Sequence, residues 1–162
     1  MISEMFSKEP LESDEYLRVK GFQARAGQAT PDKPEAPTPE VAVFRAKIML
    51  EEMLETIEAL GVAVWTSDGE HVTMSNLEFE ASGNVDLTEV ADGCADTLYV
   101  TLGTLVSCGV PDKPLIKLVW DNNDSKFEKD TSVVDGKLIK AADHQPPPIA
   151  EYIEWLRAGE VN

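Results

Sequence analysis

The chain has 162 residues, 43% of them hydrophobic, and a formal net charge of −16 at pH 7. The length suits a single domain, whereas the negative charge argues against binding to nucleic acid or to anionic membranes. The acidic N-terminal stretch lacks the apolar run of a signal peptide, and the longest uncharged run, Thr97 to Pro111, is too short to span a membrane. We therefore expect a cytoplasmic protein with no membrane partner, whose two cysteines, Cys94 and Cys108, stay reduced.

The first part of the chain predicts two helices joined by a proline-rich loop. Ser13 is expected to cap the first helix. Residues 27–39 contain four prolines, which favour an extended loop. A Thr-Pro pair at 38–39 provides the cap and the first position of the second helix, which is expected to end at Gly61.

The remaining chain predicts a hairpin, three more helices and a polar tail. An Asp-Gly pair marks the turn of a hairpin insertion at residues 61–85, where "LEFEA" adds a third short strand. The other expected elements are helices over residues 86–109, 112–123 and 149–159, and a polar tail at 124–148 with one strand at 137–140. The pattern predicts one all-α domain over residues 1–162, an antiparallel helix bundle with a small β-hairpin inserted between its second and third helices.

The second predicted helix carries four glutamates, Glu51, Glu52, Glu55 and Glu58, opposite an apolar face. Such a face is commonly just solvated, and a lysine or arginine four residues away then relieves the repulsion between like charges. Here residues 48–112 hold thirteen acidic residues and no lysine or arginine. A divalent cation is the natural counter-charge, so we interpret this face as metal-binding, with Glu58 near its edge.

The long third helix repeats this feature. Between Asp86 and Cys108 its only charges are Glu89, Asp92 and Asp96, whose spacings of three and four place them on one face. The rest of the helix is apolar nearly all round, which predicts burial on several sides and a core shared between subunits. Two such acidic helices predict a cage of oxygen ligands that suits Mg²⁺ or Mn²⁺, because the cluster contains neither histidine nor cysteine.

These segments resemble the all-α nucleoside triphosphate pyrophosphohydrolases of the MazG type, which include MazG, the dimeric dUTPases and phosphoribosyl-ATP pyrophosphohydrolase. The family hallmark is EExxE on one helix and ExxD on the next, and here "EEMLE" (51–55) is followed by "EVADGCADTLYV" (89–100). Small MazG-like proteins also carry "FHxxxGQ" and "NxSK", which read "FQARAGQ" (22–28) and "NDSK" (123–126) in this chain. "DGKLIKAADHQPP" resembles their tail, so the resemblance extends over residues 22–148.

The ExxD motif can be aligned in two ways, and both stay open. Matching "ADTLY" to the family's usual "ADLLY" selects Asp96 as the aspartate and leaves Gly93 where the family has glutamate, so that Asp92 or Glu89 substitutes. The alternative alignment uses Glu89 and Asp92 as the pair. A further departure is Gln23, which stands where histidine is commoner in the family.

The resemblance implies a reaction and a set of residue roles. Family members bind two or more Mg²⁺ or Mn²⁺ ions between the helices, and water attacks the α-phosphorus of a nucleoside triphosphate, which gives a monophosphate and pyrophosphate. Glu51 and Glu52 are the implied catalytic residues, with Glu51 activating the water. The implied metal ligands are Glu52, Glu55, Glu89, Asp92 and Asp96, and the implied substrate contacts are Phe22, Gln23, Gln28, Arg45, Asn123, Lys126 and Lys140.

The resemblance also implies a homodimer or homotetramer. The substrate would be a (d)NTP and, for a phage protein, the role would lie in the dNTP pool of the host cytoplasm, with dGTP among the candidate substrates. One alternative is a phosphoribosyl-ATP pyrophosphohydrolase, against which the extra hairpin and the long N-terminal loop count. Another is an acidic metal-binding or scaffold protein without turnover, against which Asn123 and the two tail lysines count.

Overall fold

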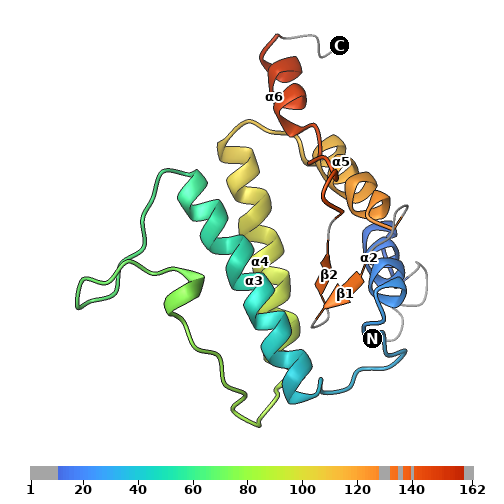
Figure 1. Ribbon diagram of the computed structural model, residues 1–162, viewed down its shortest axis with the longest axis vertical. Helices are drawn as coiled ribbons and strands as arrows, with labels where there is room; N and C mark the ends of the chain where they lie inside the picture. Colours follow the sequence, from blue (N-terminus) through green and yellow to red (C-terminus); the bar gives the residue numbers. More distant parts are fainter. Residues whose placement is uncertain (1–10, 128–131, 135–136, 140, 159–162) are drawn as a thin grey trace, which may run out of the picture. The chain divides into compact units, whose positions relative to one another are not determined.

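The computed structural model describes residues 11–127, 132–134, 137–139 and 141–158, and it is mostly helical (Figure 1). These ranges contain the α-helices α2 (Asp14–Arg25), α3 (Pro39–Ala59), α4 (Leu87–Ser107), α5 (Asp112–Ser125) and α6 (Ile149–Arg157). The predicted all-α class is confirmed, and each predicted helix is present.

The predicted helix starts follow from local capping. The side chains of Ser13 and Thr38 each accept a hydrogen bond from the backbone N–H three residues further along, at 3.1 and 3.4 Å. The carboxylate of Asp86 accepts from two backbone N–H groups in the first turn of α4, at 2.9 and 3.3 Å. These oxygens satisfy donors that have no partner inside the helix. After α3, Gly61 takes a φ of +78°, which favours glycine and ends the helix as predicted.

The segment between α3 and α4 forms a hairpin turn with far less strand than the sequence predicts. Its pairing is one isolated antiparallel bridge, Trp65 with His71, and the 3₁₀-helix η1 (Met74–Asn76) follows. The side chain of Asn76 accepts from the Thr73 N–H at 2.9 Å and donates to the His71 carbonyl at 2.8 Å. These two bonds fold the chain after His71 into η1, so that it does not continue as a strand.

The prediction of a third strand at residues 77–81 is wrong, because these residues form no strand. The two-stranded antiparallel sheet of the described residues lies in the tail instead. It pairs β1 (Ser132–Val134) with β2 (Lys137–Ile139), with Val133 opposite Leu138. The predicted tail strand is therefore confirmed as β2, whereas the sequence reading missed its partner.

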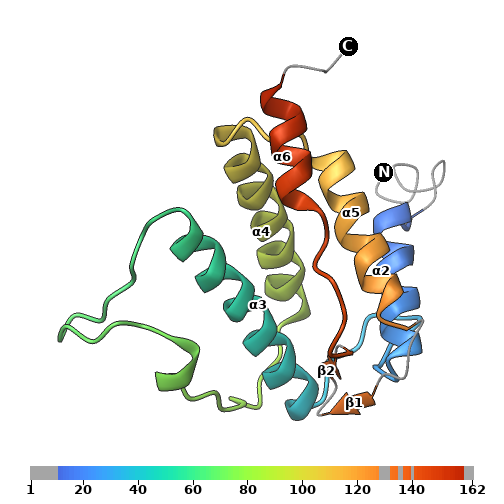
Figure 2. The same cartoon turned by 45° about the horizontal axis from the view of Figure 1, so that its top comes forward.

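The chain divides into two compact units, residues 33–92 and the segments before and after them. In the latter unit α2 packs against α5 and α5 against α6, as both views show (Figure 1, Figure 2). Within the described residues only Ala26 and Tyr152 are buried, and the Tyr152 hydroxyl donates to the Pro111 carbonyl at 3.0 Å. The core of the isolated chain is therefore small. One domain over residues 1–162 stays a prediction.

Helix α4 departs most from its predicted environment. The sequence predicts burial on several sides, but Leu98 is 67% exposed and Tyr99 and Val106 are each 79% exposed. That prediction is wrong for the single chain, because the described residues leave these side chains uncovered. Both cysteines, Cys94 in α4 and Cys108 beyond it, are free and exposed.

Among the described residues no single helix is both long enough and apolar enough to cross a membrane. Helices α4 and α5 satisfy that length and composition criterion only as a pair, and the chain bends by 115° between them.

Candidate active site

A hollow lies between the C-terminal half of α3 and residues 62–74, and we call it the α3 hollow. Its volume is about 220 Å³, and Glu51, Glu55 and Glu58 form its acidic wall. Their spacings of four and three place them on one side of the helix, where Glu51 is half-buried. Glu52 lies about 100° round the helix from Glu51, is exposed and is not part of the lining.

Two residues of the α3 hollow had no role in the sequence prediction. Glu58 falls outside EExxE but lines the same space as Glu51 and Glu55, and His71 joins it from the hairpin turn. The sequence carried a usable signal for His71, because the Asp-Gly turn folds the residues after it back along the residues before it. No comparable signal indicated that these residues would face the C-terminal half of α3.

The acids of α4 form the other half of the predicted metal site. Glu89, Asp92 and Asp96 are all exposed. Nowhere in the described ranges do three His, Cys, Asp or Glu side chains lie close enough together to hold a metal ion. The donor chemistry fits Mg²⁺ or Mn²⁺, because α3 and α4 each present carboxylates at helical spacing on one face. The described residues therefore carry suitable types of ligand, without a group of three that could hold an ion.

The predicted substrate contacts of α2 and α5 are brought together within one unit. The Lys126 ammonium donates a hydrogen bond to the side-chain oxygen of Asn123. The ring of Phe22 packs edge-to-face on Phe127, next to Lys126 in sequence, with ring centroids 5.0 Å apart. The "FQARAGQ" and "NDSK" segments, far apart in the chain, thus meet in space. The other predicted tail contact, Lys140, lies outside the described residues.

The remaining predicted contacts lie at helix ends and on α3. The backbone N–H of Gln28 donates to the Gln23 carbonyl at 2.9 Å, just beyond α2, and both residues are half-buried. On α3 the guanidinium of Arg45 lies 5.6 Å from the ring of Phe44. Burial lowers the pKa of Arg45 from its usual value. A guanidinium nevertheless stays cationic at neutral pH, so Arg45 places a positive charge about 9 Å along the helix axis from Glu51.

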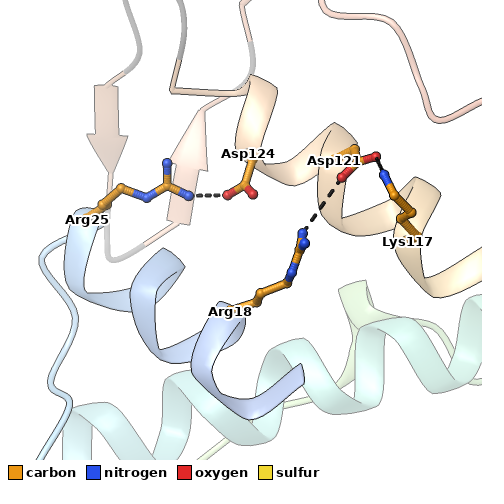
Figure 3. A network of polar contacts seen from close by, with 5 residues as sticks. All are labelled: Arg18, Arg25, Lys117, Asp121 and Asp124. Atoms are coloured by element: carbon orange, nitrogen blue, oxygen red, sulfur yellow. Dashed lines mark hydrogen bonds and ion pairs between the residues drawn. The ribbon is translucent and has the colours of Figure 1, made fainter. Parts of the chain in front are cut away.

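A polar network that the sequence reading missed holds α2 on α5 (Figure 3). Arg25 pairs with Asp124 and lies over the Phe127 ring at 4.2 Å. Arg18 approaches Asp121 at 3.8 Å, and Lys117 pairs with the same carboxylate from one turn away. The network fixes the contact between the two helices that carry the predicted nucleotide-binding segments.

The comparison with family models identifies the class of protein. Residues 19–123 match the model described as phosphoribosyl-ATP pyrophosphohydrolase, which is more than half of the chain. The all-α fold and the paired acidic helices thus belong to a pyrophosphohydrolase of the MazG-like superfamily, which confirms the resemblance seen in the sequence. Within it, the chain is a member of the phosphoribosyl-ATP pyrophosphohydrolase family, and the protein is a nucleotide pyrophosphohydrolase.

The fold is shared with a solved structure of low sequence similarity. A crystal structure of a "putative NTP pyrophosphohydrolase" from Exiguobacterium sp. 255-15 has a TM-score of 0.63 and 20% identity to this chain. The similarity covers 92% of this chain and 98% of the other, and it shows the common fold. A comparison with curated protein sequences found no match.

Proposed function

We propose that the protein is a metal-dependent nucleoside triphosphate pyrophosphatase, which hydrolyses a (d)NTP to a (d)NMP and pyrophosphate. The observation that carries this proposal is the α3 hollow, where Glu51 and Glu55 of EExxE line one wall. A triphosphate is itself strongly negative, so these carboxylates alone would repel it. Mg²⁺ or Mn²⁺ would neutralise both groups and stabilise the charge that develops on the reacting phosphate.

The roles of the carboxylates follow from where they lie. Hydrolysis joins a water oxygen to the α-phosphorus and breaks the bond to the bridging oxygen of pyrophosphate, and the water must lose a proton. We assign to Glu51, which is half-buried in the α3 hollow, the role of accepting that proton or orienting the water. The metal ligands in this proposal are Glu52 and Glu55 of α3 and two of the three acids of α4, Glu89, Asp92 and Asp96.

The positive charges of the proposal lie outside the acidic segment 48–112 of the sequence. Lys126 and Lys140 are assigned to the terminal phosphates, and Arg45 is a further phosphate contact. The hydrogen bond between Lys126 and Asn123 supports this assignment, because it fixes the ammonium beside a group that can bind the sugar. Phe22, with the glutamines at 23 and 28, is assigned to nucleotide binding near them.

A homodimer or homotetramer is part of the proposal. The single chain gathers no three metal-binding side chains in its described part, and it leaves Leu98, Tyr99 and Val106 of α4 largely exposed. A second copy packed on α4 would remove this apolar surface from water, which is the main driving force for association. We expect the metal site to be completed on association.

A second candidate is a phosphoribosyl-ATP pyrophosphohydrolase. The observation in its favour is the family model itself, which matches residues 19–123. The same carboxylates and the same bond cleavage would serve that substrate, so the two functions differ in the nucleotide that is bound. A further extension of the leading proposal is a phage enzyme that acts on dGTP or on another dNTP of the pool.

One substrate panel tests these functions. Pyrophosphate release is measured with each dNTP, each NTP and phosphoribosyl-ATP, with Mg²⁺, with Mn²⁺ and with neither ion. We expect turnover of at least one dNTP or NTP that depends on the ion. Turnover of phosphoribosyl-ATP alone would select the second candidate, and metal binding without any product would refute both.

A further inference from the structure

Apart from Glu51 and Glu55, which the proposed reaction uses, the lining of the α3 hollow suits a nucleobase better than a phosphate. It combines the three glutamates with one imidazole, one hydroxyl and six apolar side chains, and contains no lysine or arginine. A volume of about 220 Å³ is below the ~300–1,000 Å³ typical of pockets that enclose a whole drug-sized ligand. The space therefore suits part of a nucleotide. A nucleobase is a flat ring with hydrogen-bond donors on its edge. Its faces would contact the apolar side chains of the hollow, and its donors would bond to the carboxylates.

A larger groove in the same unit lacks this combination. It has a volume of about 330 Å³ and lies between the N-terminal half of α3 and residues 79–85. Its lining is chiefly apolar, and its one charged side chain is Glu80. Of these two spaces, the α3 hollow is lined by carboxylates of EExxE. It is therefore the space that would adjoin the reacting phosphate in the proposed function.

The wall opposite α3 is held in place by its own hydrogen bonds. The N–H of Val72 donates to the Val64 carbonyl at 2.8 Å, and the hydroxyl of Thr66 donates to Asp68 across the turn. This bond from Thr66 is the main reason that the pKa of the Asp68 carboxyl is lowered. The ring of His71 packs against Trp65 with centroids 5.0 Å apart. His71 is thus fixed before any ligand arrives, and a preorganised contact loses less entropy on binding.

The position of Glu58 agrees with the length of a nucleotide. Glu58 follows Glu51 by seven residues, which is a rise of about 10.5 Å along the helix axis. A nucleotide whose α-phosphate lies at the EExxE carboxylates has its base at the far side of the sugar. With the base in the α3 hollow, Glu58 is the acidic group furthest from the reaction and nearest the edge of the ring.

We propose that Glu58 and His71 bind the nucleobase of the substrate, with Glu58 selecting bases that carry an exocyclic amino group. The Glu58 carboxylate accepts a hydrogen bond from the amino group. A base with a carbonyl at that position would instead place a second hydrogen-bond acceptor next to the carboxylate. His71 packs on the ring and adds affinity without distinguishing its edge. This inference rests on the proposed function, because it assigns the base of the same substrate.

Binding of slowly hydrolysed analogues tests the inference separately from turnover. The ligands are α,β-imido triphosphates of guanine and hypoxanthine, which differ by one amino group, and of cytosine and uracil, in which a carbonyl replaces the amino group. Dissociation constants are measured by calorimetry with Mn²⁺ present. We expect the full-length protein to prefer the amino-bearing member of at least one pair. Glu58→Ala should reduce that preference at least about tenfold, within the range for one specific base contact.

Two further variants make the comparison specific. His71→Ala should weaken both members of the preferred pair by about tenfold and leave their ratio unchanged, as expected for loss of a stacking contact. Glu78→Ala removes an exposed glutamate of the same unit that does not line the hollow, and should leave the ratio unchanged. Melting curves confirm that each variant is folded.

The possible results separate the inference from the proposed function. A Glu58→Ala protein that binds both members of the pair more weakly by the same factor, or that binds both as the parent does, would overturn the inference. Absence of pyrophosphate release from every triphosphate, with the Glu58-dependent preference intact, would refute the proposed function and leave the base site standing.

Discussion

At the residue scale, the carboxylates of α3 and α4 are alike in chemistry but differ in position. Glu51 is half-buried in the α3 hollow, whereas Glu55, which also lines the hollow, and Glu52, on the neighbouring side of α3, are both exposed. In the proposed function, one helix would thus supply the water-activating group and two metal ligands. Whether Asp96 or Glu89 of α4 completes the metal site depends on which of the two side chains lies close to the ligands of α3.

The first prediction concerns the loss of single carboxylates. Glu52→Gln, Glu55→Gln and Asp96→Asn should each reduce kcat/KM at least about 100-fold, or ~2.7 kcal/mol of transition-state stabilisation. The reason is that each change removes a charged ligand and keeps the shape. The measurement uses the best dNTP at saturating Mn²⁺, with Glu78→Gln as the matched control.

The same series distinguishes the two alignments of ExxD. We expect Glu89→Gln to be affected less than Asp96→Asn. A severe loss in Glu89→Gln with a nearly normal Asp96→Asn would select the pair Glu89 and Asp92. An unaffected Glu52→Gln would show that the metal is held elsewhere.

Among the helices, the contact between α2 and α5 positions the segments that are proposed to bind the nucleotide. The Arg25 guanidinium both pairs with Asp124 and covers Phe127, and the ring of Phe127 in turn packs on Phe22. Arg25 and Asp124 are about half exposed, so solvent and salt weaken their ion pair. The stacked contact with Phe127 depends less on salt, and we expect it to be the larger contribution.

The second prediction tests this contact. Arg25→Ala should reduce the free energy of unfolding by about 1 kcal/mol, from the lost ion pair and the lost cation–π contact, and lower the Tm by roughly 2–4 °C. Lys117→Ala is the control, because its pair with Asp121 lies within α5 and is worth only about 0.3–0.5 kcal/mol. Equal shifts of the Tm in both variants would contradict the prediction that the contact between α2 and α5 stabilises the protein more than an ion pair within one helix.

At the scale of the whole molecule, the exposed apolar surface of α4 and the net charge of −16 have opposite effects. The apolar surface favours association, whereas the like charges of two subunits repel each other. Bound divalent cations would reduce that repulsion. Metal binding and subunit association are therefore expected to support each other.

The third prediction is that α4 mediates association. Sedimentation should show a dimer or tetramer for the parent protein, and Val106→Glu should shift it towards the monomer, because a charge would enter an apolar interface. Val133→Glu places the same change on an exposed side chain of β1 and should leave the assembly intact. A monomeric parent protein would contradict this prediction directly.

The fourth prediction concerns removal of the metal. EDTA should abolish turnover, and Mg²⁺ or Mn²⁺ should restore it, because the thirteen acids of residues 48–112 have no lysine or arginine among them. Saturating Mn²⁺ should also raise the Tm, with about 1–3 kcal/mol of stabilisation, because the ion binds only the folded state. Full activity in a metal-free preparation, or an unchanged Tm, would argue that the acidic faces are merely solvated.

The elements whose causes are local could be predicted from the sequence alone. Ser13, Thr38 and Asp86 start helices through bonds to N–H groups two or three residues away, and Gly61 ends α3 through a φ of +78°. The acidic motifs and the order of the segments were equally readable. Together they were sufficient for the all-α class and for the family.

The contacts between distant residues became known only from the fold. The contacts of Phe22 with Phe127 and of Arg25 with Asp124 join segments about 100 residues apart, and helical periodicity carries no information about such pairs. Glu58 and His71 also could not be paired from the sequence. They line one hollow because the turn at Gly69 brings the residues after it back towards α3. The prediction that α4 is buried on several sides is wrong for the single chain for a related reason. An apolar sequence shows that a surface must be covered, but it does not show whether this chain or another one covers it.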